Sequence, residues 1–210
     1  RTKPVVQAKT IAQNKVIFTN VIPTIRKEGV KDEYGVLYSA DGLILIKGVN
    51  SVSYIIKDGT RIIADNAFEE CKDLMSIILP DTVVAIGTRA FNRCCNLRHI
   101  SRPLSVSKIC SEAFMFCSSL ASIHIPNDQA LLGEGVFFGC SKLKMVTLPQ
   151  YMTKIPKDLF SNCSQLEALS IPETVTEFGE RSFMNCRSLE SIPISQNIKS
   201  LGDQCFCSCK

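Results

Sequence analysis

The sequence predicts a mainly β, right-handed solenoid built from short stacked coils. The first observation is a phenylalanine that recurs every 23 residues without drift, and the second is a cysteine three residues after each of them. The phenylalanines are Phe68, Phe91, Phe114, Phe137, Phe160, Phe183 and Phe206; the cysteines are Cys71, Cys94, Cys117, Cys140, Cys163, Cys186 and Cys209. A fixed period of about 20 to 50 residues is typical of solenoids and propellers.

A third observation assigns one strand to each coil. Residues 120–125 (LASIHI) have the L-x-x-L-x-L form of a leucine-rich repeat. Ile123 and Ile125 are two residues apart, so on a strand they share one face. One coil cannot bury this face alone, whereas stacked coils join their faces into a continuous core. We therefore expect a parallel, concave sheet, with phenylalanine and cysteine entering the core from irregular or short 3-10 segments on the convex side.

The repeat resembles a known family. Residues 80–91 (PDTVVAIGTRAF) follow the pattern I-x-I-P-x-x-V-x-x-I-G-x-x-A-F-x-x-C-x-x-L, which is similar to the BspA-like leucine-rich repeat. The resemblance extends over about residues 33–210. It implies a bacterial cell-surface or secreted protein used for attachment or protein binding, with no catalytic residues and no named ligand.

The N-terminal part departs from the 23-residue template. We assign residues 1–50 to an N-terminal cap and 51–210 to one continuous solenoid of about seven coils. Within the cap, short strands are expected at 16–18 and 21–23, and a hairpin at 34–47 around the turn Asp41-Gly42. A cap shields the core of the first coil from water. Alternatively, residues 1–32 are the tail of a preceding domain.

Each coil has a second inward segment after the strand, represented by Val83 and Ile86. A glycine follows it in four coils, where we expect a positive φ or tight packing: Gly87, Gly133, Gly179 and Gly202. Arg102 and Gln129 occupy positions that are apolar elsewhere. Because a buried, unpaired guanidinium is costly, we expect a local irregularity there.

The eleven cysteines do not indicate a disulfide framework. Seven occupy one repeat position, so their side chains lie parallel, whereas a disulfide needs suitably directed Cβ vectors. A free cysteine behaves as a small buried hydrophobe, so we predict a column of reduced, buried thiols. Cys95 and Cys207 lie outside this pattern, and their redox state stays open.

Composition and motifs narrow the function classes. The net charge of +4 is spread over both signs, which argues against nucleic-acid binding. No run of about 18 apolar residues indicates membrane insertion in this segment. The chain begins at Arg1 without a methionine or signal sequence, so we interpret it as a mature or cut form. No catalytic motif appears, and two histidines make a poor zinc site, so no enzyme activity, cofactor or metal is expected.

The side chains that alternate with the inward pair point outward from the concave sheet. The candidate partner-binding residues on this face are Arg98, His99, Ser101, Ser122, His124, Lys144, Met145 and Thr147. Solenoids commonly bind partners across such surfaces. We expect an extracellular adhesion module that binds a host, matrix or neighbouring surface protein; the oligomeric state stays open. The alternative is a rigid spacer within a longer surface protein.

Overall fold

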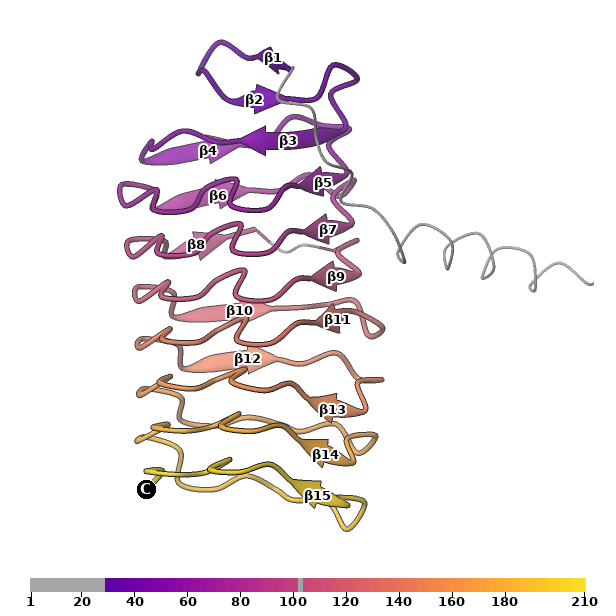
Figure 1. Ribbon diagram of the computed structural model, residues 1–210, viewed down its shortest axis with the longest axis vertical. Coiled ribbons are helices and arrows are strands. Elements are labelled where there is room, and N and C mark those ends of the chain that lie inside the picture. The colour runs from indigo at the N-terminus through magenta and orange to yellow at the C-terminus, as the bar shows by residue number, and fades with distance from the viewer. Residues whose placement is uncertain (1–28, 102–103) are drawn as a thin grey trace, which may run out of the picture.

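The chain folds into a solenoid of stacked coils (Figure 1). The computed structural model describes residues 29–101 and 104–210. Strands, turns and irregular segments make up these two ranges, without a helix. The mainly β solenoid predicted from the 23-residue period is therefore confirmed. The strands predicted at 16–18 and 21–23 lie outside the described residues.

The N-terminal cap ends in the predicted hairpin. Its strands are β1 (Val30–Lys31), β2 (Leu37–Tyr38) and β3 (Ile44–Lys47), with β2 antiparallel to both β1 and β3. Asp41 closes the turn, because its Oδ1 accepts hydrogen bonds from the Leu43 amide and the Ser39 hydroxyl. Strand β3 then pairs in parallel with the first coil. The hairpin thus covers an edge that would otherwise be open to another chain.

The coils carry two parallel ladders, which form the two columns of arrows in Figure 1. The primary ladder is the predicted sheet: β4 (Ser53–Ile55), β6 (Ser76–Ile78), β8 (His99–Ile100), β10 (Ser122–His124) and β12 (Met145–Thr147). The secondary ladder was not predicted: β5 (Ile62–Ile63), β7 (Ala85–Ile86), β9 (Lys108–Ile109), β11 (Leu131–Leu132), β13 (Lys154–Ile155), β14 (Glu177–Phe178) and β15 (Ser200–Leu201). Each of these strands offers a single inward residue, such as Ile86.

The phenylalanines form one column through the core. The six from Phe68 to Phe183 are fully buried, and each ring lies nearly parallel to the next with centroids 5.2–6.0 Å apart. Phe206 continues the stack at 5.4 Å from Phe183 and is partly buried. The predicted stacking of identical coils is therefore confirmed.

The cysteine column is buried from Cys71 to Cys186, and six of its seven thiols have a defined hydrogen-bond partner. From Cys94 onward the sulfur donates to the carbonyl oxygen of the phenylalanine 26 residues earlier, at 3.0–3.2 Å. Burial raises the pKa of the Cys140 and Cys186 thiols to about 12. The column therefore consists of protonated donors that join neighbouring coils.

This burial predicts two classes of thiol reactivity. Cys207 is exposed and Cys95, Cys110 and Cys209 are half-buried, whereas the other seven cysteines are buried. Only thiolates attack alkylating or disulfide reagents, so we expect no more than about four thiols to react rapidly at pH 8. All eleven should react in denaturant. Counting thiols with a chromogenic disulfide reagent in both states checks this, and rapid native labelling of all eleven would contradict it.

The glycines after the secondary strand are required by close packing and not by a positive φ. A Cβ at Gly179 would lie 2.5 Å from the Lys157 amide nitrogen, and one at Gly133 would lie 2.4 Å from that of Ser111. Neither glycine has a positive φ. The Gly179 amide donates to the Ile155 carbonyl at 2.8 Å, which closes the ladder between the two coils.

Replacing Gly179 by alanine should therefore destabilise the protein. The added methyl group forces the two coils apart, and overpacking of this kind typically costs about 1–3 kcal/mol in the free energy of unfolding. Urea denaturation followed by circular dichroism measures this. Cys110→Ala is the matched control, because Cys110 occupies the repeat position of Gly179 in an earlier coil and already has a Cβ. Equal effects of the two changes would refute close packing as the cause.

The secondary ladder is interrupted between β11 and β13. Pro156 stands at the glycine position there and has no N–H to donate to the Leu132 carbonyl. The predicted irregularity at Gln129 lies beside it: Gln129 is exposed, and Ala130 is the residue that is buried. Arg102, where the other irregularity was expected, lies outside the described residues.

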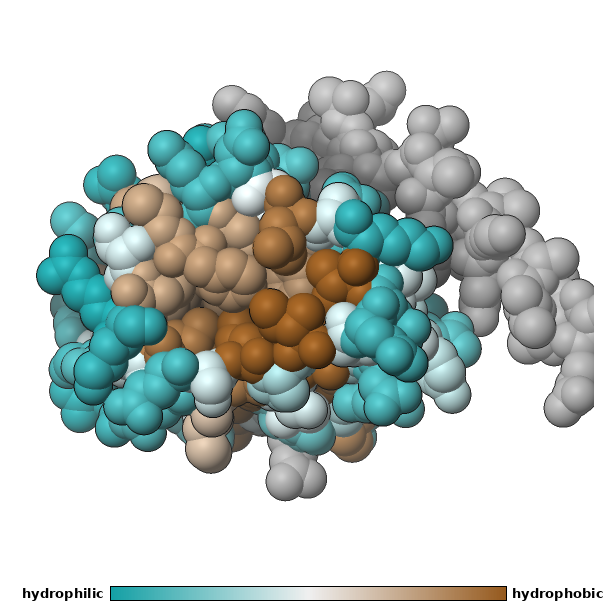
Figure 2. All heavy atoms as spheres, turned by 90° about the horizontal axis from the view of Figure 1, so that it is seen from below, coloured by the Kyte–Doolittle hydropathy of each residue, from teal (hydrophilic) through white to brown (hydrophobic). Residues whose placement is uncertain are grey.

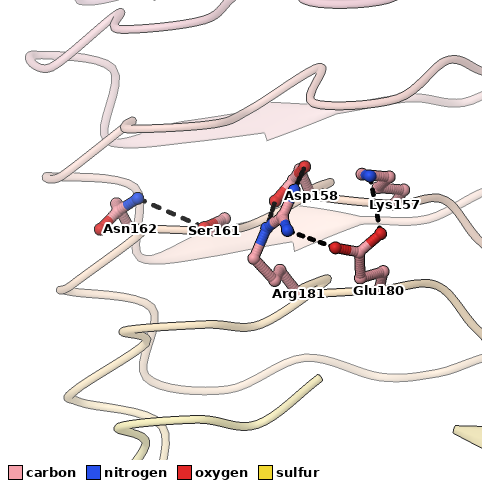
Figure 3. A network of polar contacts seen from close by, with 6 residues as sticks. All are labelled: Lys157, Asp158, Ser161, Asn162, Glu180 and Arg181. Atoms are coloured by element: carbon pink, nitrogen blue, oxygen red, sulfur yellow. Dashed lines mark hydrogen bonds and ion pairs between the residues drawn. The ribbon is translucent and has the colours of Figure 1, made fainter. Parts of the chain in front are cut away.

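Charged pairs 23 residues apart join the coils outside the core (Figure 3). Arg181 donates through Nε and Nη2 to both carboxylate oxygens of Asp158, each at 2.9 Å, and also contacts Glu180. Lys157 binds the second oxygen of Glu180 at 2.6 Å. Arg181 and Asp158 both have a positive φ (52° and 55°). Bidentate pairs fix geometry, so this network favours one register between the coils.

The C-terminal end of the solenoid presents apolar surface. Figure 2, which views the molecule from that end, shows a hydrophobic area enclosed by hydrophilic side chains. Ile194 and Leu201 of the last coil are each 55% exposed. Their equivalents in inner coils are covered by the next coil, which shows how much of each coil's core its neighbour supplies.

Candidate binding face

The outward side chains of the primary ladder form the candidate binding face. Parallel pairing without a register shift sets Ser122 beside Met145 and His124 beside Thr147. The inward residues between them, Ile123 and Val146, are buried. Alternation along the strand therefore holds the outward groups in straight columns, one coil apart.

Seven of the eight predicted residues are exposed on this face: Arg98, His99, Ser122, His124, Lys144, Met145 and Thr147. Ser101 differs, because it is half-buried and its hydroxyl bonds to the backbone of Leu79. The Leu79 amide donates to Ser101 Oγ at 2.8 Å, and Ser101 Oγ donates to the Leu79 carbonyl at 3.3 Å. Ser101 thus ties two coils together in addition to lying on the face.

The face is divided between two groups of strands. β4, β6 and β8 pair with one another, and β10 pairs with β12, without recorded pairing between β8 and β10. His99 and His124 therefore lie on separate groups. In the described parts of the chain, no three His, Cys, Asp or Glu side chains gather as metal ligands would.

A broad hollow of about 680 Å³ lies on the second group of strands. Its lining combines predicted residues with neighbours from the following two coils: Ser122, Ile123, His124, Met145, Val146, Thr147, Ala168, Leu169, Ser170, Ser191 and Pro193. These side chains are small or apolar, apart from His124. Charge lies at its border, where Lys144 binds Glu167 at 2.8 Å.

The predicted residues of this face include one large apolar side chain, Met145, and omit those of the first coils. Ile55 and Ile78 pair across β4 and β6 and are 68% and 42% exposed. Met75, which directly precedes β6, is 39% exposed, and Met145 in the hollow is 65% exposed. The available signal was an aliphatic residue at an outward position of the strand pattern. Contiguous exposed apolar groups commonly mark interaction sites.

The fold and the repeat geometry define the class of this protein: it is a leucine-rich-repeat solenoid. The family model described as BspA type Leucine rich repeat region matches in six copies, over residues 47–158 and 93–210. The chain therefore belongs to the BspA-type leucine-rich-repeat family. In the described residues, no helix is long and apolar enough to cross a membrane.

Solved bacterial structures share the fold. The leucine rich repeat protein TpLRR of T. pallidum is 26% identical, with a TM-score of 0.74 over 83% of this chain and 86% of its own. A leucine rich cell surface protein of Faecalibacterium prausnitzii is 28% identical, with a TM-score of 0.76 over 87% of this chain. The match spans 52% of that protein's length. The search of curated proteins returns no match.

Proposed function

We propose that this solenoid is a non-enzymatic protein-binding module that holds its partner on the primary ladder. The observation that carries the proposal is the set of exposed apolar side chains, Ile55, Ile78 and Met145, on an otherwise small and polar sheet face. Apolar groups held on rigid strands lose little conformational entropy on binding, so more of their burial energy goes into affinity.

The partner's contact surface should be apolar at its centre and charged at its rim. The hollow over β10 and β12 accepts an apolar side chain beside Met145, and the uncharged serines around it can donate or accept hydrogen bonds. Arg98 lies outside the hollow and adds a basic group in an earlier coil. This division resembles the apolar core and polar rim of known interfaces.

Adhesion at a cell surface is the setting we propose for this module. The support is the membership of the BspA-type family and the likeness to a protein described as a leucine rich cell surface protein. Repeat solenoids of this kind typically act by binding and not by catalysis. The partner we expect is a host, matrix or neighbouring surface protein.

A matched pair of variants tests the proposal. Met145→Asp places a charge on the primary ladder, and Leu131→Asp places one on the secondary ladder at nearly the same exposure (65% and 64%). Binding of the purified protein to immobilised matrix proteins and to cells should fall at least about tenfold for Met145→Asp, because the charge must be desolvated in the interface. Leu131→Asp should leave binding unchanged, and both variants should unfold at the wild-type temperature.

If the solenoid acts only as a spacer, a different result is expected. Replacing His99, Ser122, His124 and Lys144 together by alanine would then leave every binding partner unaffected. Loss of binding in Leu131→Asp but not in Met145→Asp would assign the interface to the secondary ladder and refute the proposal.

A further inference from the structure

A second, smaller site lies on the convex side of the solenoid, away from both ladders. A hollow of about 390 Å³ opens there between three neighbouring coils. Its lining includes Glu69 and Asn92, which follow Phe68 and Phe91 directly, and Phe116, two residues after Phe114. The residues at the Glu69 position after Asn92 are Met115, Phe138, Ser161, Met184 and Cys207, so the pairing of a carboxylate with an amide at this position is particular to the first coils.

Asn92 in this hollow carries a buried acceptor without a donor. Its side chain is 6% exposed, and Nδ2 donates to Glu69 Oε1 at 2.9 Å. A carboxylate only accepts hydrogen bonds, so this contact fixes which end of the amide faces Glu69. The other end, Oδ1, is buried and has no hydrogen-bond partner among the described residues. A buried polar atom of this kind is costly unless a ligand or ordered water supplies a donor.

Arg89 and Arg93 also line this hollow, and Glu69 is the one carboxylate of its lining that makes no ion pair in the described part of the chain. Arg89 binds Glu112 at 2.5 Å, and Arg93 lies 3.8 Å from Glu70. Glu69 takes part in none of the ion pairs found in residues 29–101 and 104–210. The hollow therefore combines a carboxylate whose one side-chain partner is the Asn92 amide with an amide oxygen that has no donor among the described residues, and a positively charged donor would suit both.

The wall of the hollow is suited to a cation. Phe116 is 36% exposed at a repeat position where the other coils hold polar residues or glycine. Its ring packs edge-on against Phe138 at 5.4 Å, and the Arg93 guanidinium lies over it at 5.7 Å. The Arg93 guanidinium thus already occupies one face of the ring. The rest of its exposed surface can pack against the alkyl stem of a second basic side chain.

We propose that this hollow binds a lysine side chain from a basic segment of a partner protein. The ammonium group would donate to Asn92 Oδ1 and Glu69 and pack its stem against Phe116. An ammonium has three donors and no acceptor, which matches the unused groups. A metal ion fits less well, since the described residues contain no group of three His, Cys, Asp or Glu side chains arranged to hold one. The site does not depend on the primary ladder.

The test is a titration of the ¹⁵N-labelled protein with the peptide acetyl-Gly-Gly-Lys-Gly-Gly-amide, followed by amide chemical shifts. Saturable shifts are expected at residues 69–70, 89–93 and 112–116. Glu69→Gln keeps the shape of the side chain and should weaken binding by about tenfold, because a charged hydrogen-bond acceptor becomes neutral. The matched control is Glu167→Gln, which removes the exposed carboxylate that binds Lys144 and should bind the peptide as the wild type does.

Other outcomes overturn the proposal. Equal shifts from the same peptide with norleucine in place of lysine would show that no cation is recognised. Unchanged affinity in Glu69→Gln, whose own spectrum reports whether it is folded, would remove the proposed anchor. Shifts at these residues with calcium chloride but not with the peptide would make the hollow a metal site. Met145→Asp should not alter the titration, so this proposal and the primary-ladder proposal fail separately.

Discussion

Replacing Phe114 by alanine should lower the free energy of unfolding by about 3–5 kcal/mol. The ring is fully buried and lies between those of Phe91 and Phe137, at 5.2 and 6.0 Å. The Phe114 backbone is also tied to the following coil, because its amide donates to the Val136 carbonyl at 3.0 Å and its carbonyl accepts from Cys140 Sγ at 3.1 Å. The cavity therefore cannot close without moving the chain. Urea unfolding monitored by far-ultraviolet circular dichroism measures the change.

Two controls separate this effect from the general loss of an aromatic ring. Phe206→Ala removes the last ring of the column, which is only partly buried, and Phe116→Ala removes an exposed ring outside the core. Both should cost less than half as much, because exposed surroundings bury less apolar area and leave a smaller cavity. A cost for Phe114→Ala within about 1 kcal/mol of either control would mean that the column is not the main source of stability.

The parts of the fold that the sequence predicted are those that one coil specifies by itself. The spacing of Phe114 and Cys117 occurs seven times and the position of Ile123 six times, so many copies indicate the same inward positions. The hairpin was predictable because Asp41 and Gly42 form a local turn. For Gly179 the sequence left two explanations open, a positive φ and close packing. Only the position of the Lys157 backbone in the neighbouring coil decides between them.

The features that escaped prediction depend on contacts between coils. A secondary strand such as β7 has two residues and one inward side chain, which is too short to show a period of two. The ladder is interrupted at Pro156 because proline has no N–H to donate to the Leu132 carbonyl, and this acceptor lies in the preceding coil. The candidate face was predicted from alternation, but the predicted residues did not include the apolar pair Ile55 and Ile78, which meet only when β4 pairs with β6. The convex hollow combines side chains from three coils.

Removal of one whole coil should leave a folded protein, whereas removal of half a coil should not. Deleting residues 69–91 joins Phe68 to Asn92, so that Cys94 again follows a core phenylalanine by three residues. Strand β8 can then pair with β4, and β9 with β5. Since solenoid stability is approximately a sum over coils and their interfaces, one coil and one interface are lost. We expect a cooperative transition at lower urea concentration, with a reduced m-value because less surface is exposed on unfolding.

Deleting residues 80–91 is the matched half-coil change. It removes β7 and Phe91 but keeps β6, so the chain leaves the primary ladder without a secondary strand to follow. The backbone groups that β7 paired with on β5 and β9 lose their partners, and unpaired buried backbone groups are costly. We expect loss of cooperative unfolding and a larger hydrodynamic radius by size-exclusion chromatography. If this shorter deletion were the better tolerated of the two, stability would not reside in complete coils, and the coil could not be the unit that folds.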